Sequence, residues 1–222
     1  MFSILKRMAR AAPVPAGLAA LLLTGCFAGG AQKAEPAAYD LFASASASNN
    51  AGAANANAGA GLWLRLAEIQ APAWLNTPAM QYRLAYAEPE RRYSFAESRW
   101  VAPPAELLEQ VLRRQEVVRR SRYEAEGCQL HLALDEFVQT FDAPGSSRAL
   151  IEVRATLLAP RGVRLVAQRT FSQAPAAGGD AKSGVAGFVV AARGLGAELN
   201  GWLNGLQRDT PELMARCRAA AP

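Results

Sequence analysis

Three consecutive strand-like segments constrain the fold of this chain more than any other feature. They cover residues 130–141, 149–158 and 163–171, and in the first of them Leu130, Leu132 and Leu134 alternate with polar residues, as is typical of a strand that buries one face. Turn sequences that contain Pro and Gly reverse the chain between them. The pattern predicts a three-stranded meander.

Two amphipathic segments predict the helices that accompany this meander. Residues 183–206 repeat apolar side chains at helical spacing on one face, and residues 104–118 do so directly after two prolines. The longer segment also contains several glycines, which indicate close packing of the helix on the sheet: Gly187, Gly194, Gly196 and Gly201.

Shorter stretches supply the rest of the expected sheet. Residues 39–42 and 62–66 favour short strands, and residues 80–86 form a hairpin with residues 93–95 across a charged turn. The expected fold is of the α/β class, more narrowly α+β. We expect a single domain with a mixed, mostly antiparallel sheet of about five strands and two long flanking helices.

Residues 43–61 interrupt this pattern with a stretch of Ala, Ser, Asn and Gly that carries no charge. Such a segment buries too little apolar surface to offset the entropy of ordering it, so we expect a flexible loop. An Ala-rich helix is the alternative, against which the four Asn and the several Gly residues count.

The first 26 residues have the organisation of a bacterial lipoprotein signal. Lys6, Arg7 and Arg10 precede an apolar run that is too short to span a bilayer, and Leu23-Thr24-Gly25-Cys26 follows it. This sequence resembles a lipobox, which predicts acylation of Cys26. The alternative is an ordinary cleaved signal in which Cys26 is incidental; both export the chain.

The expected organisation follows from that signal. Residues 1–25 are the lipoprotein signal peptide, 26–38 the lipidated cysteine and tether, and 39–222 the domain. Phe27 stands where lipoproteins retained in the inner membrane usually carry Asp, which favours the outer membrane and a domain that faces the periplasm. The lipid on Cys26 is covalent, and no other cofactor is expected.

The remaining cysteines, Cys128 and Cys217, are predicted to lie in an oxidising compartment. A disulfide between them would remove on the order of 4 kcal/mol of denatured-state entropy in the chain-entropy model. Two separately buried or unpaired thiols are the alternative.

Charge and histidine content disfavour several classes of function. The formal charge is +5, but three of these charges belong to the signal, so about +2 remains and no nucleic-acid partner is indicated. His131 is the only histidine, and no Ser or Cys is placed to make it a catalytic base. The chain also lacks metal-ligand spacing, so neither an enzyme nor a metal protein is expected.

Asp135 and Glu136 could be read as a pair of catalytic carboxylates. Adjacent residues of a regular strand point to opposite faces, so we expect them not to share a substrate. A solvated strand end is the expected interpretation.

The order of segments resembles that of the ABC-type transport auxiliary lipoprotein family. The resemblance covers residues 39–206 and rests on these stretches: Tyr39-Asp40-Leu41, Pro72-Ala73-Trp74-Leu75-Asn76-Thr77-Pro78, Met80-Gln81-Tyr82-Arg83, Arg99-Trp100, Pro103-Pro104, Leu134-Asp135-Glu136-Phe137, Arg154-Ala155-Thr156-Leu157-Leu158 and Gln168-Arg169-Thr170-Phe171. The insertion at 43–61 and the tail at 210–222 depart from the family pattern.

This resemblance implies a membrane-anchored periplasmic lipoprotein that assists an ABC transporter and its MCE-domain partner in moving lipids or other hydrophobic molecules. The residue types enriched at interface hot spots then suggest the docking residues Tyr82, Arg83, Tyr93, Arg99 and Trp100. The alternative places Tyr82 and Trp100 in the core and the arginines in solvent. Two other functions stay open: a lipid-binding carrier and an assembly or structural lipoprotein of the outer membrane.

Overall fold

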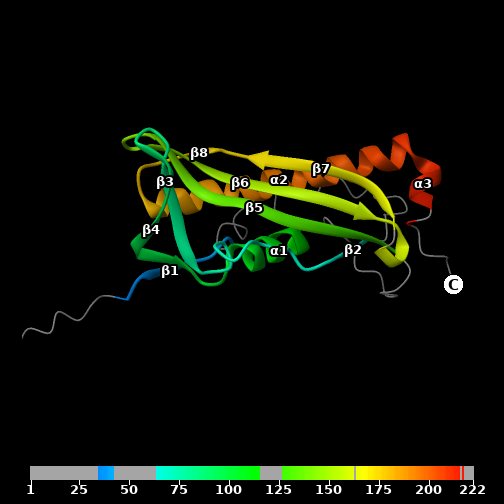
Figure 1. Cartoon of the computed structure of the whole chain (residues 1–222), viewed down its shortest axis with the longest axis horizontal. Helices are drawn as coiled ribbons and strands as arrows, with labels where there is room; N and C mark the ends of the chain where they lie inside the picture. Colours follow the sequence, from blue (N-terminus) through cyan, green and yellow to red (C-terminus); the bar gives the residue numbers. More distant parts are fainter. Residues whose placement is uncertain (1–34, 43–63, 116–126, 163, 216, 218–222) are drawn as a thin grey trace, which may run out of the picture. The chain divides into compact units, whose positions relative to one another are not determined.

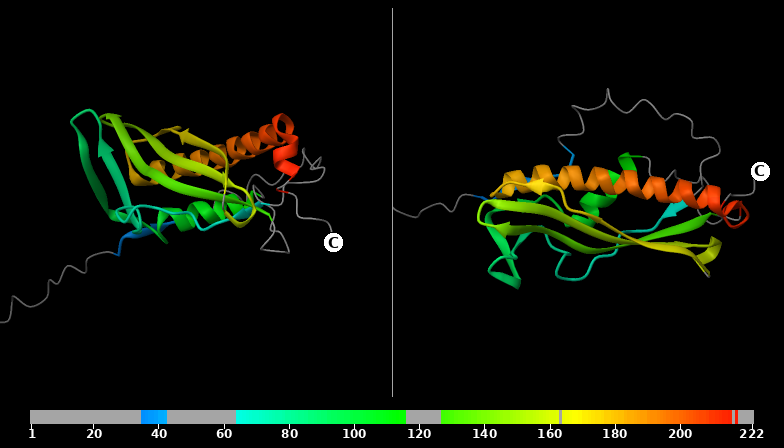
Figure 2. Two further views of the ribbon diagram at one scale, coloured as in Figure 1. Left: turned by 45° about the vertical axis from the view of Figure 1, so that its right-hand side comes forward. Right: turned by 90° about the horizontal axis from the view of Figure 1, so that it is seen from above.

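The computed structural model describes residues 35–42, 64–115, 127–162, 164–215 and 217, which form a sheet with helices on one face (Figures 1 and 2). The strands are β1 Ala37–Tyr39, β2 Leu64–Leu66, β3 Ala79–Leu84, β4 Glu88–Trp100, β5 Cys128–Ala143, β6 Ser146–Leu158, β7 Leu165–Gln173 and β8 Ala176–Ala177. The helices are α1 Pro104–Arg114, α2 Ala181–Asp209 and α3 Pro211–Ala215, with a short 3-10 turn at Pro160–Gly162.

The predicted meander is confirmed. Strands β5, β6 and β7 run antiparallel, with Leu130 opposite Leu157 and Val153 opposite Phe171. The β5–β6 turn contains Gly145, whose φ of 78° is unfavourable for residues with a side chain. Alternate residues of β6 are buried, and we call the face of the sheet that α1 and α2 cover the inner face.

The predicted hairpin is also present, although its turn lies earlier than expected. Strands β3 and β4 pair antiparallel, with Tyr82 opposite Tyr93, and the chain reverses at residues 85–87. Residues 88–92, which the charge pattern assigned to a turn, belong to β4.

The sheet has eight strands, more than the five expected, in the order β1-β4-β3-β5-β6-β7 with β2 and β8 paired to β5 and β6. Strand β2 lies within the predicted segment 62–66 and β1 overlaps the predicted segment 39–42 at Tyr39, whereas the two residues of β8 are too few to give a periodic signal. Parallel pairing joins β1 to β4, β3 to β5 and β2 to β5. The mixed, mostly antiparallel sheet is therefore confirmed with more strands.

Both predicted helices are present. The described part of α1 begins at Pro104, and the expected extension toward residue 118 lies outside the described residues. Helix α2 starts two residues earlier than predicted because Asp180 caps it: the Ser183 backbone N–H donates to Asp180 Oδ1 at 2.7 Å. This capping hydrogen bond lowers the pKa of the Asp180 carboxyl.

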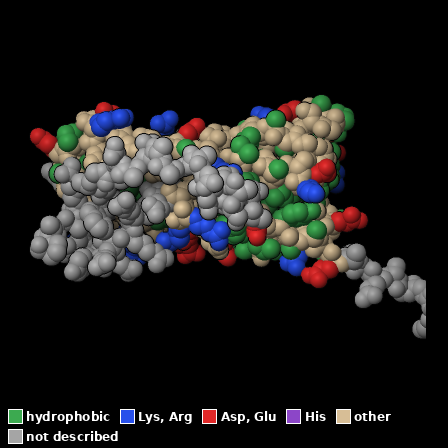
Figure 3. Space-filling view, turned by 180° about the vertical axis from the view of Figure 1, so that it is seen from behind, with side chains coloured by type: hydrophobic (Ala, Val, Ile, Leu, Met, Phe, Trp, Pro, Cys, Tyr) green, Lys and Arg blue, Asp and Glu red, His purple; other side chains and the backbone are tan. Residues whose placement is uncertain are grey.

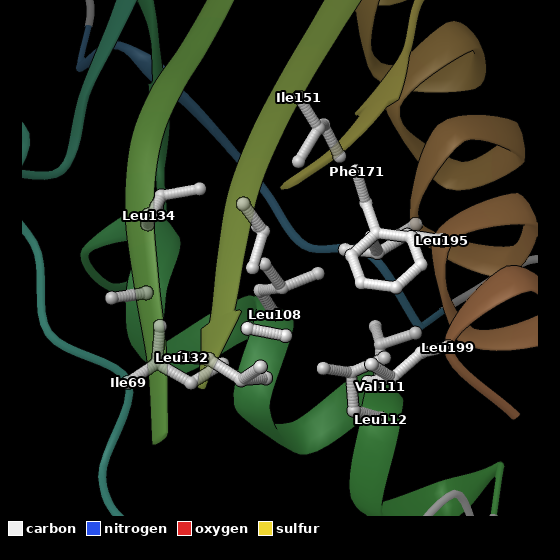
Figure 4. Close-up of a cluster of buried hydrophobic side chains, with 14 of the residues drawn as sticks. Ile69, Leu108, Val111, Leu112, Leu132, Leu134, Ile151, Phe171, Leu195 and Leu199 are labelled. Carbon is white, nitrogen blue, oxygen red and sulfur yellow. The ribbon is translucent and has the colours of Figure 1, made fainter. Parts of the chain in front are cut away.

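The core lies between the inner face and the two helices. In Figure 4, Leu108 and Leu112 of α1 and Leu195 of α2 approach side chains of β5, β6 and β7. At the hairpin side of the core, Phe137 of β5 stacks on Phe188 of α2 with ring centroids 4.3 Å apart. These contacts explain the apolar periodicity of α1, α2 and the strands β5 to β7.

A disulfide joins Cys128, the first residue of β5, to Cys217, which follows α3. Both cysteines are fully buried, with 0% exposure. The bond therefore fastens the chain after the last helix to the start of the longest strand. The low-complexity segment 43–61 lies outside the described residues.

Candidate docking surface on the hairpin

The structure removes Trp100 from the candidate docking residues. Its side chain is 1% exposed, and its ring makes edge contacts with Phe137 and Phe188, each at 5.5 Å between centroids. Trp100 ends β4 where β1 pairs alongside it, so this large apolar ring belongs to the core. The set of docking residues expected from the sequence is therefore corrected by the removal of Trp100.

Tyr82 and Tyr93 lie together on the hairpin. Their rings stack with centroids 5.1 Å apart, and Tyr82 also contacts the rings of Phe95 at 4.7 Å and Phe141 at 5.8 Å. The Arg91 guanidinium lies over the Tyr93 ring, 4.5 Å from the ring centroid. Tyr82, Tyr93 and Phe95 are half-buried, so this aromatic cluster is partly open to a partner.

The helical side of the molecule gives a wider view of this region. In Figure 3, hydrophobic side chains lie between scattered charged groups on the part of this side that is not drawn in grey. A half-open aromatic surface rimmed by charge is typical of a protein interface.

Arg83 takes part in a second group on the opposite, outer face. Glu136 of β5 accepts two hydrogen bonds of 2.6 Å from Arg92 Nη2, one at each carboxylate oxygen, and a longer one of 3.4 Å from Arg83 Nη2. The Arg92 guanidinium lies over the Trp74 ring at 4.0 Å. We call these four residues, Trp74, Arg83, Arg92 and Glu136, the outer-face cluster.

Glu136 reaches this cluster because β5 contains a bulge. Leu134 pairs with Val153 and Glu136 with Glu152, so Asp135 is an extra residue in the strand. Leu134 and Phe137 are both buried, which leaves the two acidic residues between them on the outer face. The prediction that Asp135 and Glu136 point to opposite faces is wrong for this reason.

Both acidic residues bind arginines, and they bind different ones. Asp135 accepts a hydrogen bond of 2.9 Å from Arg154, and Glu136 is held by Arg92 and Arg83. His131 lies on β5 with its Nε2 atom 3.2 Å from Gln129 Oε1. Among the residues that the structure describes, no three His, Cys, Asp or Glu side chains form a group that could hold a metal ion.

Arg99 lies apart from both clusters, at the base of the hairpin. It is half-buried and pairs in register with Ala79 of β3 and Ala38 of β1. The structure thus brings Tyr82 and Tyr93 together on one face of the hairpin and places Arg83 on the opposite face. Arg99 lies at the base of the hairpin, and Trp100 is buried.

Sequence reasoning missed Trp74, Arg92 and Glu136 as members of this surface. Trp74 precedes β3 in a turn, and Gln81 Nε2 fixes that turn by donating to the Trp74 carbonyl at 2.7 Å. The run Arg91-Arg92 next to aromatic residues was the available signal, but a turn was expected there.

Comparison with known proteins agrees with this architecture. The family model described as "ABC-type transport auxiliary lipoprotein component" matches residues 39–200. The crystal structure of protein XCC0632 from Xanthomonas campestris, a DUF330 family member, has 24% sequence identity and a TM-score of 0.59, and the match covers 68% of this chain and 88% of that one.

A crystal structure of an uncharacterized protein has 18% identity and a TM-score of 0.50, and the match covers 64% of this chain and 90% of that one. At these identities the two likenesses show the fold alone. No curated protein matches the sequence significantly.

Proposed function

Because the chain belongs to the ABC-type transport auxiliary lipoprotein family, we propose that it assists an ABC transporter and an MCE-domain partner in moving lipids or other hydrophobic molecules across the cell envelope. The observation that carries this proposal is the family match over residues 39–200, which includes the hairpin and most of α2. The chain would act by docking rather than by catalysis.

The proposal includes a lipid anchor on Cys26. Residues 1–25 would be removed as the signal, residues 26–38 would form the lipidated cysteine and tether, and the domain would follow from residue 39. Phe27 after the cysteine supports the outer membrane as the destination, with the domain facing the periplasm. In the described part of the chain, no helix is long and apolar enough to cross a membrane.

The hairpin is the proposed docking surface. Tyr82 and Tyr93 offer half-buried aromatic area on one face of the hairpin, Arg83 offers a guanidinium group on the opposite face, and Arg99 lies at the base. Aromatic and Arg side chains are enriched at interface hot spots because they combine large contact area with several donors. Trp100, the last residue of β4, lies in the core beneath this surface.

Affinity purification of the tagged protein from the envelope of its native host tests the function, with partners identified by mass spectrometry. We expect an ABC transporter or an MCE-domain protein to be recovered. The Cys26→Ala variant controls for correct localisation. Recovery of no envelope transport component would contradict the proposal, and recovery of bound lipid alone would favour a lipid carrier.

A further inference from the structure

One guanidinium of the outer-face cluster is held only weakly. Arg92 binds Glu136 at 2.6 Å, whereas Arg83 reaches the same carboxylate at 3.4 Å. Within the described ranges, the buried Arg83 Nε atom has no hydrogen-bond acceptor. Because Arg92 keeps Glu136 paired, Arg83 can leave this carboxylate without leaving a buried charge unpartnered.

The strand beside Arg83 has a further unsatisfied group. Thr140 pairs with Arg83 in the parallel β3–β5 register, and its buried Oγ1 atom also has no partner among the described residues. Native structures satisfy nearly all buried polar atoms with protein groups or water, so these two neighbouring atoms have the capacity for a further hydrogen bond.

The charges of the cluster indicate which ligand would bind there. Arg83 and Arg92 together face one carboxylate, Glu136, which leaves one positive charge in excess. Both arginine side chains are 24% exposed, so a ligand can reach them while solvent screens them only partly.

Acidic groups border the cluster. Glu152 lies opposite Glu136 in the β5–β6 register, and Ser172 donates to Glu152 at 3.4 Å. Glu136 and Glu152 repel every anion, but they repel a doubly charged phosphate about twice as strongly as a carboxylate, whose single charge matches the one guanidinium that Glu136 holds at 3.4 Å. A carboxylate also matches the fork of donors on a guanidinium.

We propose that Arg83 binds a carboxylate side chain of the protein partner that docks on the hairpin, and that Trp74 forms the apolar rim of this contact. Trp74 is 43% exposed and is fixed against Arg92, so it presents a rigid aromatic surface beside the charge. This inference rests on the proposed function, since it states the chemistry of that partner.

The first test needs no identified partner. The whole exported chain, purified in a mild detergent, is titrated with N-acetyl-aspartate N-methylamide while the Arg Nε–H resonances are followed by NMR. The Arg83 resonance is identified by its loss in Arg83→Lys. We expect a saturable shift of this resonance in the millimolar range and none with the corresponding asparagine amide at equal ionic strength.

Two results would overturn the inference. One is an Arg83 resonance that responds equally to the aspartate and asparagine compounds. The other is a response to inorganic phosphate that equals or exceeds the response to the carboxylate. The matched control is the resonance of Arg148, which Asp142 already holds at 2.7 and 2.8 Å and which should not shift.

The second test uses the envelope purification. Arg83→Gln should lower recovery of the transport partner about tenfold or more, as expected for removal of one member of a desolvated charge pair, while Arg148→Gln leaves it unchanged. Equal recovery with both variants would overturn the inference. If the unmodified protein recovers no transport component, the proposed function fails, while the titration still decides whether Arg83 binds carboxylates.

Discussion

At the residue scale, three glutamine side chains lie so close to glycines of α2 that a Cβ atom at those positions would collide with them. The position of an added Cβ atom at Gly184 lies 2.1 Å from Gln139 Oε1, at Gly194 it lies 2.4 Å from Gln173 Oε1, and at Gly196 it lies 1.6 Å from Gln115 Oε1. The sequence predicted packing on the sheet for the α2 glycines. That is correct for Gly187, which meets Ala149, and wrong for Gly201, which has no neighbour within 4 Å among the residues that the structure describes.

Gln139 is the least able of these glutamines to move. It is fully buried, and its Nε2 atom lies within 2.9 to 3.2 Å of Ser147 Oγ and the carbonyls of Gly178 and Asp180. These contacts fasten the start of α2 to the sheet. A side chain added at Gly184 would therefore have to displace the Gln139 side chain, which these hydrogen bonds hold in place.

We predict that Gly184→Ala destabilises the protein by about 1–3 kcal/mol, because overpacking outweighs the gain in helix propensity. Gly201→Ala is the matched control: since no atom of the described residues lies within 4 Å of the new Cβ, it should stabilise the protein by up to about 1 kcal/mol. Urea unfolding of both variants measures the difference. Equal effects of the two substitutions would show that the Gln139 contact does not hold.

At the element scale, local hydrogen bonds and one covalent link set where the elements begin and end. Asp180 and Ser183 cap each other at the start of α2, and Cys217 fastens the chain after α3 to Cys128 of β5. The cap could be found from sequence, but the helix was expected to begin at Ser183. The disulfide was one of two open alternatives, and the structure contains the bond.

The α2 cap predicts a dependence of stability on pH. Its hydrogen bond from Ser183 lowers the pKa of Asp180, so the cap stabilises the folded state above the unfolded-state pKa of about 3.9. This contribution is lost as the pH falls through the lower, folded-state value. The unfolding free energies of the original protein and Asp180→Ala should therefore differ at neutral pH and converge in acid; a gap that persists in acid would refute this account.

Removal of the disulfide should lower stability substantially. It joins residues 89 positions apart, and in the chain-entropy model closure of such a loop contributes about 4 kcal/mol. Denaturant unfolding with and without reductant measures this contribution. The double variant Cys128→Ser/Cys217→Ser is the control and should not respond to reductant; an unchanged midpoint for the reduced original protein would contradict the prediction.

At the scale of the whole molecule, the sheet presents different chemistry on its two faces. The inner face packs on α1 and α2, whereas the outer face carries ion pairs such as Arg154–Asp135 and Arg92–Glu136. The hairpin extends this contrast, with the Tyr82–Tyr93 stack on one side and the outer-face cluster on the other. A partner on one face of the hairpin would therefore meet the aromatic stack, and a partner on the other face would meet the outer-face cluster.

The anchor proposal predicts where variants of the whole protein accumulate. Cys26→Ala should remove the acyl chains and release the exported protein into the soluble periplasmic fraction. Phe27→Asp should keep the acylated protein in the inner membrane, because Asp after the cysteine is the usual retention residue. Fractionation of the envelope with immunodetection measures both; membrane association of Cys26→Ala would contradict the acylation site.

The sequence by itself determined the long elements and their types. Strands β5, β6 and β7 and helices α1 and α2 follow from periodicities of two and 3.6 residues, which report how one face of a local segment is buried. The order of these segments was also enough to suggest the family that the model match supports.

Only the tertiary structure decided which side chains meet. The bulge at Asp135 turned Glu136 toward Arg92, and Trp100 is buried where β1 pairs with β4. Arg83 makes only a long contact to Glu136, whose carboxylate Arg92 already binds. These outcomes depend on strand order and register between residues far apart in the chain. Local periodicity does not contain that information, because it fixes the face of a residue but not its neighbour on the next strand.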